Sequence, residues 1–199
     1  MTSTSTRIVA GLAALVAAAA LSSCSSADDH NAQASSSATS AEQVAAHNVD
    51  DVAFAENMIP HHQQALELSA LVPDRSTNPA VVKLATTISS EQQPEMAAMR
   101  ALLLQWEVNP NDVPDHSAHA GMGMSGMVDD ATMAELTSLN GPAFDTLWLQ
   151  SMINHHQGAV EMAKAEIAKG QSVDMISMAK NIVTAQQAEI DQMKQMLGG

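Results

Sequence analysis

Apolar and polar positions follow the period of an α-helix over most of the chain beyond residue 47. Ala, Leu, Met, Gln and Glu dominate these stretches, runs of β-branched residues are short, and tyrosine is absent. Turn-forming residues interrupt the pattern at Pro73-Asp74, Asn78-Pro79 and Lys169-Gly170. The pattern therefore predicts an all-α fold built on long helices. We expect these helices at residues 48–72, 79–106, 142–169 and 172–197.

The sequence contains an internal repeat of one helical unit. Aligned without a gap, residues 51–103 match residues 145–197 at an offset of 94, so that Met58-Ile-Pro-His-His-Gln lies opposite Met152-Ile-Asn-His-His-Gln. The register holds across the intervening turn, which indicates duplication of a whole helical hairpin. Neither hairpin can bury its apolar stripe alone. We therefore expect the two repeated hairpins to pair as a ferritin-like four-helix bundle.

The helical period also predicts which faces point inward. At 100° per residue, both histidines of each motif straddle the same stripe as the methionine that precedes them. Pro60 and Pro94 fall inside predicted helices whose phase continues on both sides, so each is expected to kink its helix rather than end it. The second helix of each hairpin directs a glutamate and a methionine at the core.

Buried polar side chains must be paired or bound to something. The histidines and glutamates of the stripe have two interpretations, a hydrogen-bond network among themselves or a metal site. The duplication of Met-x-x-His-His, with an inward glutamate on the next helix, favours the metal site. Each methionine alone is also ordinary core filling. The candidate metal ligands on the helices are Met58, His61, His62, Glu95, Met99, Met152, His155, His156, Glu189 and Met193.

The linker between the repeats, residues 107–141, carries a second set of candidate ligands. Its glycines and serines argue against a packed core, so its methionines and histidines are expected to be exposed without a packing reason. Thioether and imidazole together suit copper, because methionine favours Cu(I) and histidine accepts either oxidation state. A low-complexity linker that happens to be rich in methionine is the alternative. The candidate ligands are His116, His119, Met122, Met124 and Met127, and a short helix is expected at 131–139.

The first residues have the pattern of an export signal. The apolar run from Ile8 to Leu21 is too short for a permanent membrane span, and Leu21-Ser-Ser-Cys24 resembles a bacterial lipobox. We expect residues 1–23 to be a lipoprotein signal peptide, Cys24 to carry the lipid, and residues 24–47 to be a flexible tether. The protein would then be anchored at the outer face of the cytoplasmic membrane or in the cell envelope. An ordinary secreted protein is the alternative.

The formal net charge of −14 argues against nucleic acid or an anionic membrane surface as partner. A single cysteine excludes an internal disulfide. The sequence contains no nucleophile triad, phosphate-binding loop or dinucleotide motif, so we expect a binding protein rather than an enzyme. Its oligomeric state is left open.

These motifs resemble a family of bacterial secreted proteins, domain-of-unknown-function family 305. The resemblance rests on the doubled His-His motif, Phe144-Asp145 and Gln92-Gln-x-Glu95, and it covers residues 48–197. It implies a ferritin-like four-helix bundle in the periplasm or on the cell surface, and some relatives are linked to copper binding and copper tolerance. The ligands it implies here are Met58, His61, His62, Met152, His155 and His156.

The sequence therefore predicts an extracytoplasmic lipoprotein that binds copper and sequesters it or confers tolerance to it. The first alternative is an iron protein with a di-metal carboxylate site. That class needs Glu-x-x-His pairs, and this chain has none at the inward positions. The second alternative is a helical binding module without metal, in which the histidine pairs are structural.

Overall fold

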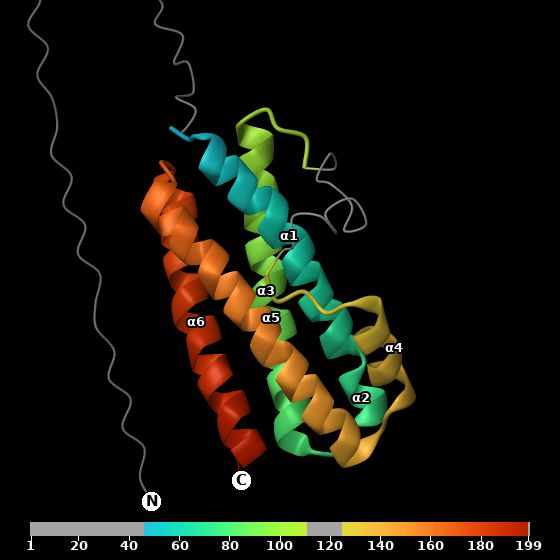
Figure 1. Ribbon diagram of the computed structural model, residues 1–199. Coiled ribbons are helices and arrows are strands. Elements are labelled where there is room, and N and C mark those ends of the chain that lie inside the picture. The colour runs from blue at the N-terminus through green and yellow to red at the C-terminus, as the bar shows by residue number, and fades with distance from the viewer. Residues whose placement is uncertain (1–45, 111–124, 199) are drawn as a thin grey trace, which may run out of the picture. The chain divides into compact units, whose positions relative to one another are not determined.

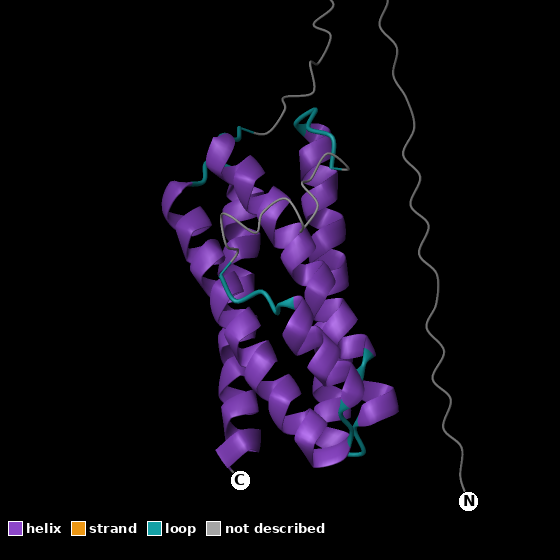
Figure 2. Cartoon of the chain, turned by 45° about the vertical axis from the view of Figure 1, so that its right-hand side comes forward, coloured by secondary structure: helices purple, strands orange, loops and turns teal. Residues whose placement is uncertain are grey.

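The computed structural model describes residues 46–110 and 125–198. These residues are helical with connecting loops and include no strand (Figures 1 and 2), so the predicted all-α class is confirmed for them. The helices are α1 (Val49–Ala70), α2 (Val72–Arg75), α3 (Pro79–Gln105), α4 (Asp130–Ser138), α5 (Gly141–Lys169) and α6 (Val173–Gly198).

The long helices pack in the pairs expected from the repeat. α1 lies against α3 and α5 lies against α6, while α1 and α5 join the two pairs. α3 and α6 touch each other only sparsely. α1 and α5 run side by side in opposite directions (Figure 1). The first-repeat and second-repeat histidine motifs are thus brought to one interface. The likeness to ferritin-like bundles stays a prediction.

The predicted helix ends need one correction. α1 ends at Ala70 rather than at residue 72, and the short helix α2 follows it with Pro73 in its first turn. Proline fits the first turn of a helix because the amide that it lacks has no partner there. Both α1 and α3 continue through their internal prolines, Pro60 and Pro94, as predicted.

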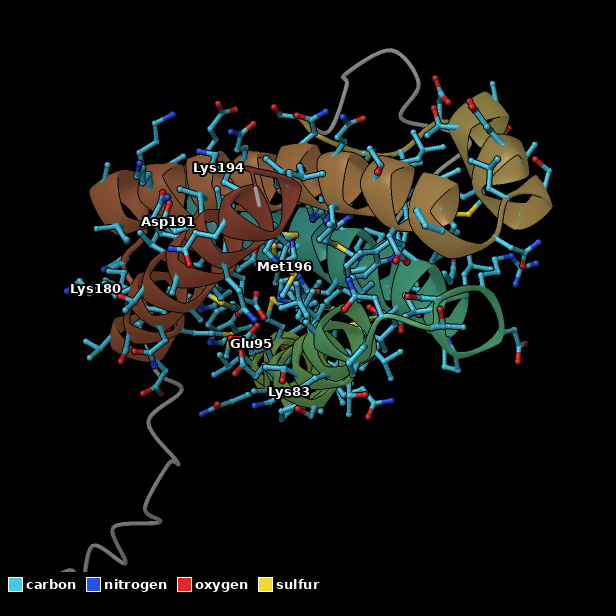
Figure 3. The ribbon with its side chains drawn as sticks, turned by 90° about the horizontal axis from the view of Figure 1, so that it is seen from below. Lys83, Glu95, Lys180, Asp191, Lys194 and Met196 are labelled. Carbon is cyan, nitrogen blue, oxygen red and sulfur yellow. The ribbon has the colours of Figure 1, made fainter. Side chains whose placement is uncertain are left out.

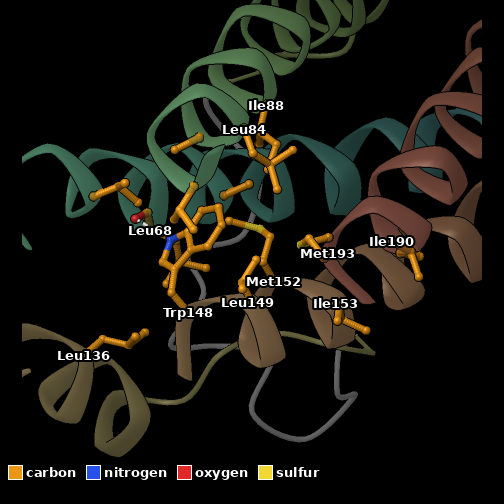
Figure 4. Close-up of a cluster of buried hydrophobic side chains, with 14 of the residues drawn as sticks. Leu68, Leu84, Ile88, Leu136, Trp148, Leu149, Met152, Ile153, Ile190 and Met193 are labelled. Atoms are coloured by element: carbon orange, nitrogen blue, oxygen red, sulfur yellow. Dashed lines mark hydrogen bonds between the residues drawn. The ribbon is translucent and has the colours of Figure 1, made fainter. Parts of the chain in front are cut away.

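Two clusters of buried apolar side chains form the core. One surrounds Trp148 and Met152 of α5 (Figure 4), and the other surrounds Met58 of α1. The indole Nε1–H of Trp148 donates to the carbonyl of Leu68 at 2.9 Å, which satisfies its polar atom inside the cluster. Each such large side chain contributes about 1.5–3 kcal/mol by its burial. Leu197, which the helical pattern directed inward, is instead 37% exposed at the end of α6.

A buried carboxylate ties the start of α1 to the turn between α5 and α6. Asn48 and Asp51 form a reciprocal capping box at the first turn of α1. Asp51 also accepts hydrogen bonds from the backbone amides of Gln171 and Ser172 at 2.9–3.1 Å. Burial alone would raise the pKa of Asp51, but the amides of Asn48, Ser172 and Gln171 outweigh it and hold that pKa below its ordinary value.

The linker is packed in its part beyond residue 127, where the short helix expected at 131–139 is present as α4. Leu136 of α4 is fully buried, and Val128 and Met133 lie against the cluster around Trp148. Four linker candidates, His116, His119, Met122 and Met124, lie outside the described residues, as do Cys24 and the proposed signal peptide. Within the described ranges, no helix is long and apolar enough to cross a membrane.

Candidate metal centre

His61 and His155 meet at the interface between α1 and α5. Their ring centroids are 3.8 Å apart and the ring planes are inclined by 37°. The two residues occupy the same position in the two repeats, so a local twofold axis passes between them. Both rings are buried, with exposures of 0% and 1%. Met58 and Met152, one helical turn earlier on α1 and α5, are also fully buried.

The other histidine of each motif turns toward the second helix of its own hairpin. The Nε2 atom of His62 lies 2.7 Å from Oε2 of Glu95, and that of His156 lies 2.8 Å from Oε2 of Glu189. Since a carboxylate only accepts hydrogen bonds, Nε2 of each ring carries the donated proton. In a neutral ring the lone pair is then on Nδ1. A carboxylate that orients a histidine in this way is the usual partner of a metal-binding imidazole.

Burial favours the neutral form of His155 and His62. It lowers the pKa of His155 well below its ordinary value, and the nearby rings of His61, His156 and His62 lower it further. The pKa of His62 is lowered by burial too, although its hydrogen bond to Glu95 opposes the shift. A neutral imidazole is the form that coordinates metal ions.

Several buried polar atoms of this region have no hydrogen-bond partner in the described part of the protein. Such atoms are rare in folded proteins and mark places where a water molecule or an ion completes the bonding. They are His62 Nδ1, both ring nitrogens of His155, His156 Nδ1, Glu189 Oε1, both amide atoms of Gln92, and Gln186 Oε1.

The donor atoms fit a soft metal better than a hard one. No three His, Cys, Asp or Glu side chains within the described ranges converge as a metal site. A site made of imidazole and carboxylate alone is therefore not preformed, and the buried thioethers of Met58 and Met152 are the nearest additional ligands in sequence. Imidazole with thioether is a donor set that copper accepts.

The remaining predicted methionines lie in the two core clusters. Met99 packs in the cluster that contains Met58, and Met193 packs in the cluster that contains Met152. Their packing accounts for their burial without a ligand role. Met127 is partly buried.

A segment of the linker that precedes α4 lies directly over the central histidines. We call residues 125–128 the strap. The carbonyl of Ser125 accepts from Nε2–H of His61 at 3.3 Å. Further along the strap, Val128 and the side-chain amide of Gln64 exchange two hydrogen bonds of 2.7 and 2.8 Å. The hydroxyl of Ser125 also donates to Glu161 at 2.9 Å. The strap thus covers the α1–α5 face of the site.

Two glycines make this close approach possible. A methyl group on Gly158 would overlap the backbone of Ser125, and one on Gly126 would overlap the carbonyl of Asn154. Gly126 also has a φ of 86°, a conformation that favours glycine. The sequence interpretation missed the strap. A signal was present, since Gly158 stands opposite Gln64 shortly after the histidine pair that the two repeats share.

Comparison with known proteins identifies the family. The family model for the domain of unknown function DUF305 matches residues 51–197. The chain belongs to the DUF305 family. Among DUF305 proteins of solved structure, a fragment from Deinococcus radiodurans is 35% identical, with a TM-score of 0.68, over 76% of this chain and 97% of that one. One from Streptomyces coelicolor, described as secreted, is 34% identical, with a TM-score of 0.69, over 75% of this chain and 92% of that one.

CopM, a protein solved in several metal-bound forms, has a similar structure. Its Cu(I)-bound form is 31% identical, with a TM-score of 0.61, over 73% of this chain and 94% of that one. Cu(II)-bound, Ag-bound and apo forms of CopM match as well. A protein of Acanthamoeba polyphaga mimivirus is 36% identical over 55 residues, which cover 28% of this chain and only 36% of that protein.

Proposed function

We propose that this DUF305 protein binds copper outside the cytoplasm and sequesters it or confers tolerance to it. The ligands are the imidazoles of His61, His62, His155 and His156 with the thioethers of Met58 and Met152. Glu95 and Glu189 orient two of the imidazoles rather than bind the metal themselves. In this proposal the four long helices form a ferritin-like bundle whose two halves share the site.

One observation carries the proposal. Neutral imidazoles from both repeats are buried together at a local twofold axis with ring nitrogens that lack a protein partner. A structural network of histidines and glutamates accounts for the Nε2 atoms of His62 and His156 only. The unpaired nitrogens of His62, His155 and His156 still need a partner, and a metal ion supplies one. The copper-bound and silver-bound forms of CopM support a soft metal as that partner.

The di-metal carboxylate alternative has less support. Such a site needs several carboxylates converging with histidines on one pair of ions. Here the two inward glutamates each bond to a histidine through one carboxylate oxygen, and the chain has no Glu-x-x-His pair at the inward positions.

Export and lipid attachment at Cys24 belong to the same proposal. The apolar run before Cys24 and the proposed tether after it support a position of the metal-binding domain, residues 48–197, outside the cytoplasmic membrane. The Streptomyces coelicolor relative, described as secreted, supports export. Metabolic labelling of the expressed protein with a radioactive fatty acid tests the attachment. We expect labelling that Cys24→Ser abolishes, and an unlabelled wild-type protein would contradict it.

Metal binding is tested by replacing the imidazoles of His61 and His155 with aromatic rings that contain no nitrogen. The double variant His61→Phe, His155→Phe keeps two flat rings in the core. We expect it to lose Cu(I) affinity by more than about 100-fold, since even the loss of an orienting partner costs 10–100-fold. A competition titration with a chromogenic Cu(I) chelator measures this.

A matched control comes from outside the site. His47 stacks on Trp106 with ring centroids 4.5 Å apart, before the start of α1. His47→Phe keeps a stacked ring, and its affinity should equal that of the wild type. If the double variant folds and binds Cu(I) as tightly as this control, the proposed function is wrong.

A further inference from the structure

The two carboxylate–histidine pairs are equivalent in sequence but differ in exposure. The side chain of Glu95 is 21% exposed, whereas that of Glu189 is 9% exposed. Both are hydrogen-bonded to fully buried histidines. His62 is therefore one side chain away from solvent, and its repeat equivalent His156 is more deeply enclosed.

Glu95 owes its exposure to a groove between α3 and α6. These helices barely touch, and an open groove of about 350 Å³ lies between them. Viewed from below, Glu95 lies on the side of α3 that faces α6 (Figure 3). The lining residues are Pro94, Glu95 and Ala98 of α3 and Asp174, Ser177, Met178 and Asn181 of α6. We call this feature the α3–α6 groove.

Small and acidic residues keep the groove open and negative, and the repeat-equivalent positions have different residues. Ala98 corresponds to Gln192 at the offset of 94, and Ser177 corresponds to Lys83. Asp174 corresponds to Ala80. At the repeat-equivalent positions the sequence thus has two longer side chains, one of them cationic, and lacks the carboxylate of Asp174. Beside Glu95, the carboxylates of Asp174 and Glu95 attract a cation, and the residues that line the groove include no cationic side chain.

The opposite face of the histidines is closed by the strap. The carbonyl of Ser125 contacts His61, and no methyl group fits between Gly158 and the strap. We propose that the α3–α6 groove is the route by which the metal cation reaches the buried histidines, attracted by the carboxylates of Asp174 at its rim and of Glu95 beside His62. This inference rests on the proposed function and adds to it the side of the protein from which the metal ion enters.

Glu95 supplies negative charge where the groove reaches the buried histidines. Its carboxylate is in contact with solvent and with Nε2 of His62 at once. Glu91, one turn earlier on α3, has its pKa raised by burial and by the nearby carboxylates of Glu189 and Glu95. Glu91 does not line the groove, and this shift reflects the carboxylates of both halves of the molecule. The thioether of Met178 in the same groove adds a soft ligand along the route.

The test replaces two residues that line the groove with the residues found at the equivalent positions of the other repeat. The variant Ala98→Gln, Ser177→Lys should close the groove and repel cations, and neither residue belongs to the proposed ligand set. We expect Cu(I), supplied as its acetonitrile complex, to be taken up about tenfold more slowly or worse. The affinity at equilibrium should change less than threefold. Stopped-flow tryptophan fluorescence measures the rate, and a chelator titration measures the affinity.

The control is Ala97→Gln, Ser177→Thr. Ala97 is exposed on α3 but does not line the groove, and threonine at 177 adds no charge. Uptake by this variant should match that of the wild type. Equal uptake rates in the wild type and in the closed-groove variant would overturn the proposal, and so would faster uptake by Gln64→Ala, which loosens the strap on the other face.

A second readout needs no metal. Diethylpyrocarbonate modifies accessible imidazoles, and tandem mass spectrometry assigns the modified residue. We expect His62 to react faster than His156 in the wild type and to lose this advantage in the closed-groove variant. A wild type that binds no Cu(I) would overturn the proposed function. The absence of any difference between His62 and His156 would overturn the access route, whether or not copper binds.

Discussion

Glu166 is buried against Asp51 where the end of α5 approaches the start of α1. Its exposure is 2%, and Gly170 leaves room for its carboxyl group, because a methyl group there would overlap it. Burial, a hydrogen bond with Asp51 and the charges of Asp51 and Asp50 raise the pKa of Glu166 to about 8. At neutral pH this residue is thus mainly protonated, which removes the repulsion between its carboxyl group and the Asp51 carboxylate.

This protonation makes stability depend on pH in a defined direction. The pKa of Glu166 rises on folding from 4.5 to about 8, so the folded state holds the proton more tightly than the unfolded state. The stabilisation is fully present below pH 4.5 and is lost as pH rises through about 8. We expect the urea midpoint of the wild type to fall between pH 6 and pH 9, and Glu166→Gln to flatten this fall.

The comparison variant is Glu67→Gln, which removes an exposed carboxylate from α1. It should follow the wild-type pH profile. If Glu166→Gln shows the same fall as the wild type, Glu166 is not the group responsible.

For single residues, the sequence correctly predicted which side chains point inward at positions where the two repeats agree. The inward direction of Met58, His61 and His62 follows from the helical period, and the second copy confirms the register. Glu166 lies opposite Val72 in the alignment, so the duplication gives no hint of its role. Its partner Asp51 is far away in the chain, and only the fold brings the two together.

Among the elements, the strap is the one that the periodicity could not predict. It has no regular structure, and its position depends on hydrogen bonds to Gln64 and on the missing side chain of Gly158. The long helices were predicted to within a few residues because the apolar stripe and the turn residues agree. The break between α1 and α2 was missed, since the apolar pattern continues across it.

The strap is tested by Gly158→Ala. Alanine favours a helix by about 1 kcal/mol over glycine, so α5 itself should not suffer. The added methyl group overlaps Ser125 and should displace the strap. We expect the backbone amide of Val128, which donates to Gln64 at 2.8 Å, to lose its protection from hydrogen exchange. Gly198→Ala, where a methyl group meets nothing within 4 Å, should leave that protection unchanged.

An amide of Val128 that stays protected in Gly158→Ala would mean that the strap tolerates the methyl group. The central histidines would then have a looser cover than the contacts indicate.

At the scale of the whole molecule, the duplicated hairpin forms a core with local twofold symmetry. Sequence differences between the two repeats make the two sides of this core unlike each other. The His61–His155 contact lies on the local twofold axis. The strap covers one side through the Gln64–Gly158 difference, and the α3–α6 groove opens the other through the differences at Ala98 and Ser177. The proposed metal site is therefore covered on one side and accessible from the other, whereas a fully symmetric arrangement would make the two sides alike.

The central claim is that imidazole and thioether groups from both repeats bind copper together. X-ray absorption spectroscopy at the copper edge of the Cu(I)-loaded protein tests it most directly. We predict sulfur and imidazole nitrogen in the first coordination sphere. The sulfur contribution should be lost in Met58→Leu, Met152→Leu, a volume-conserving pair of changes that costs less than about 1.5 kcal/mol each in stability. A first sphere of nitrogen and oxygen alone, unchanged by these substitutions, would contradict the account.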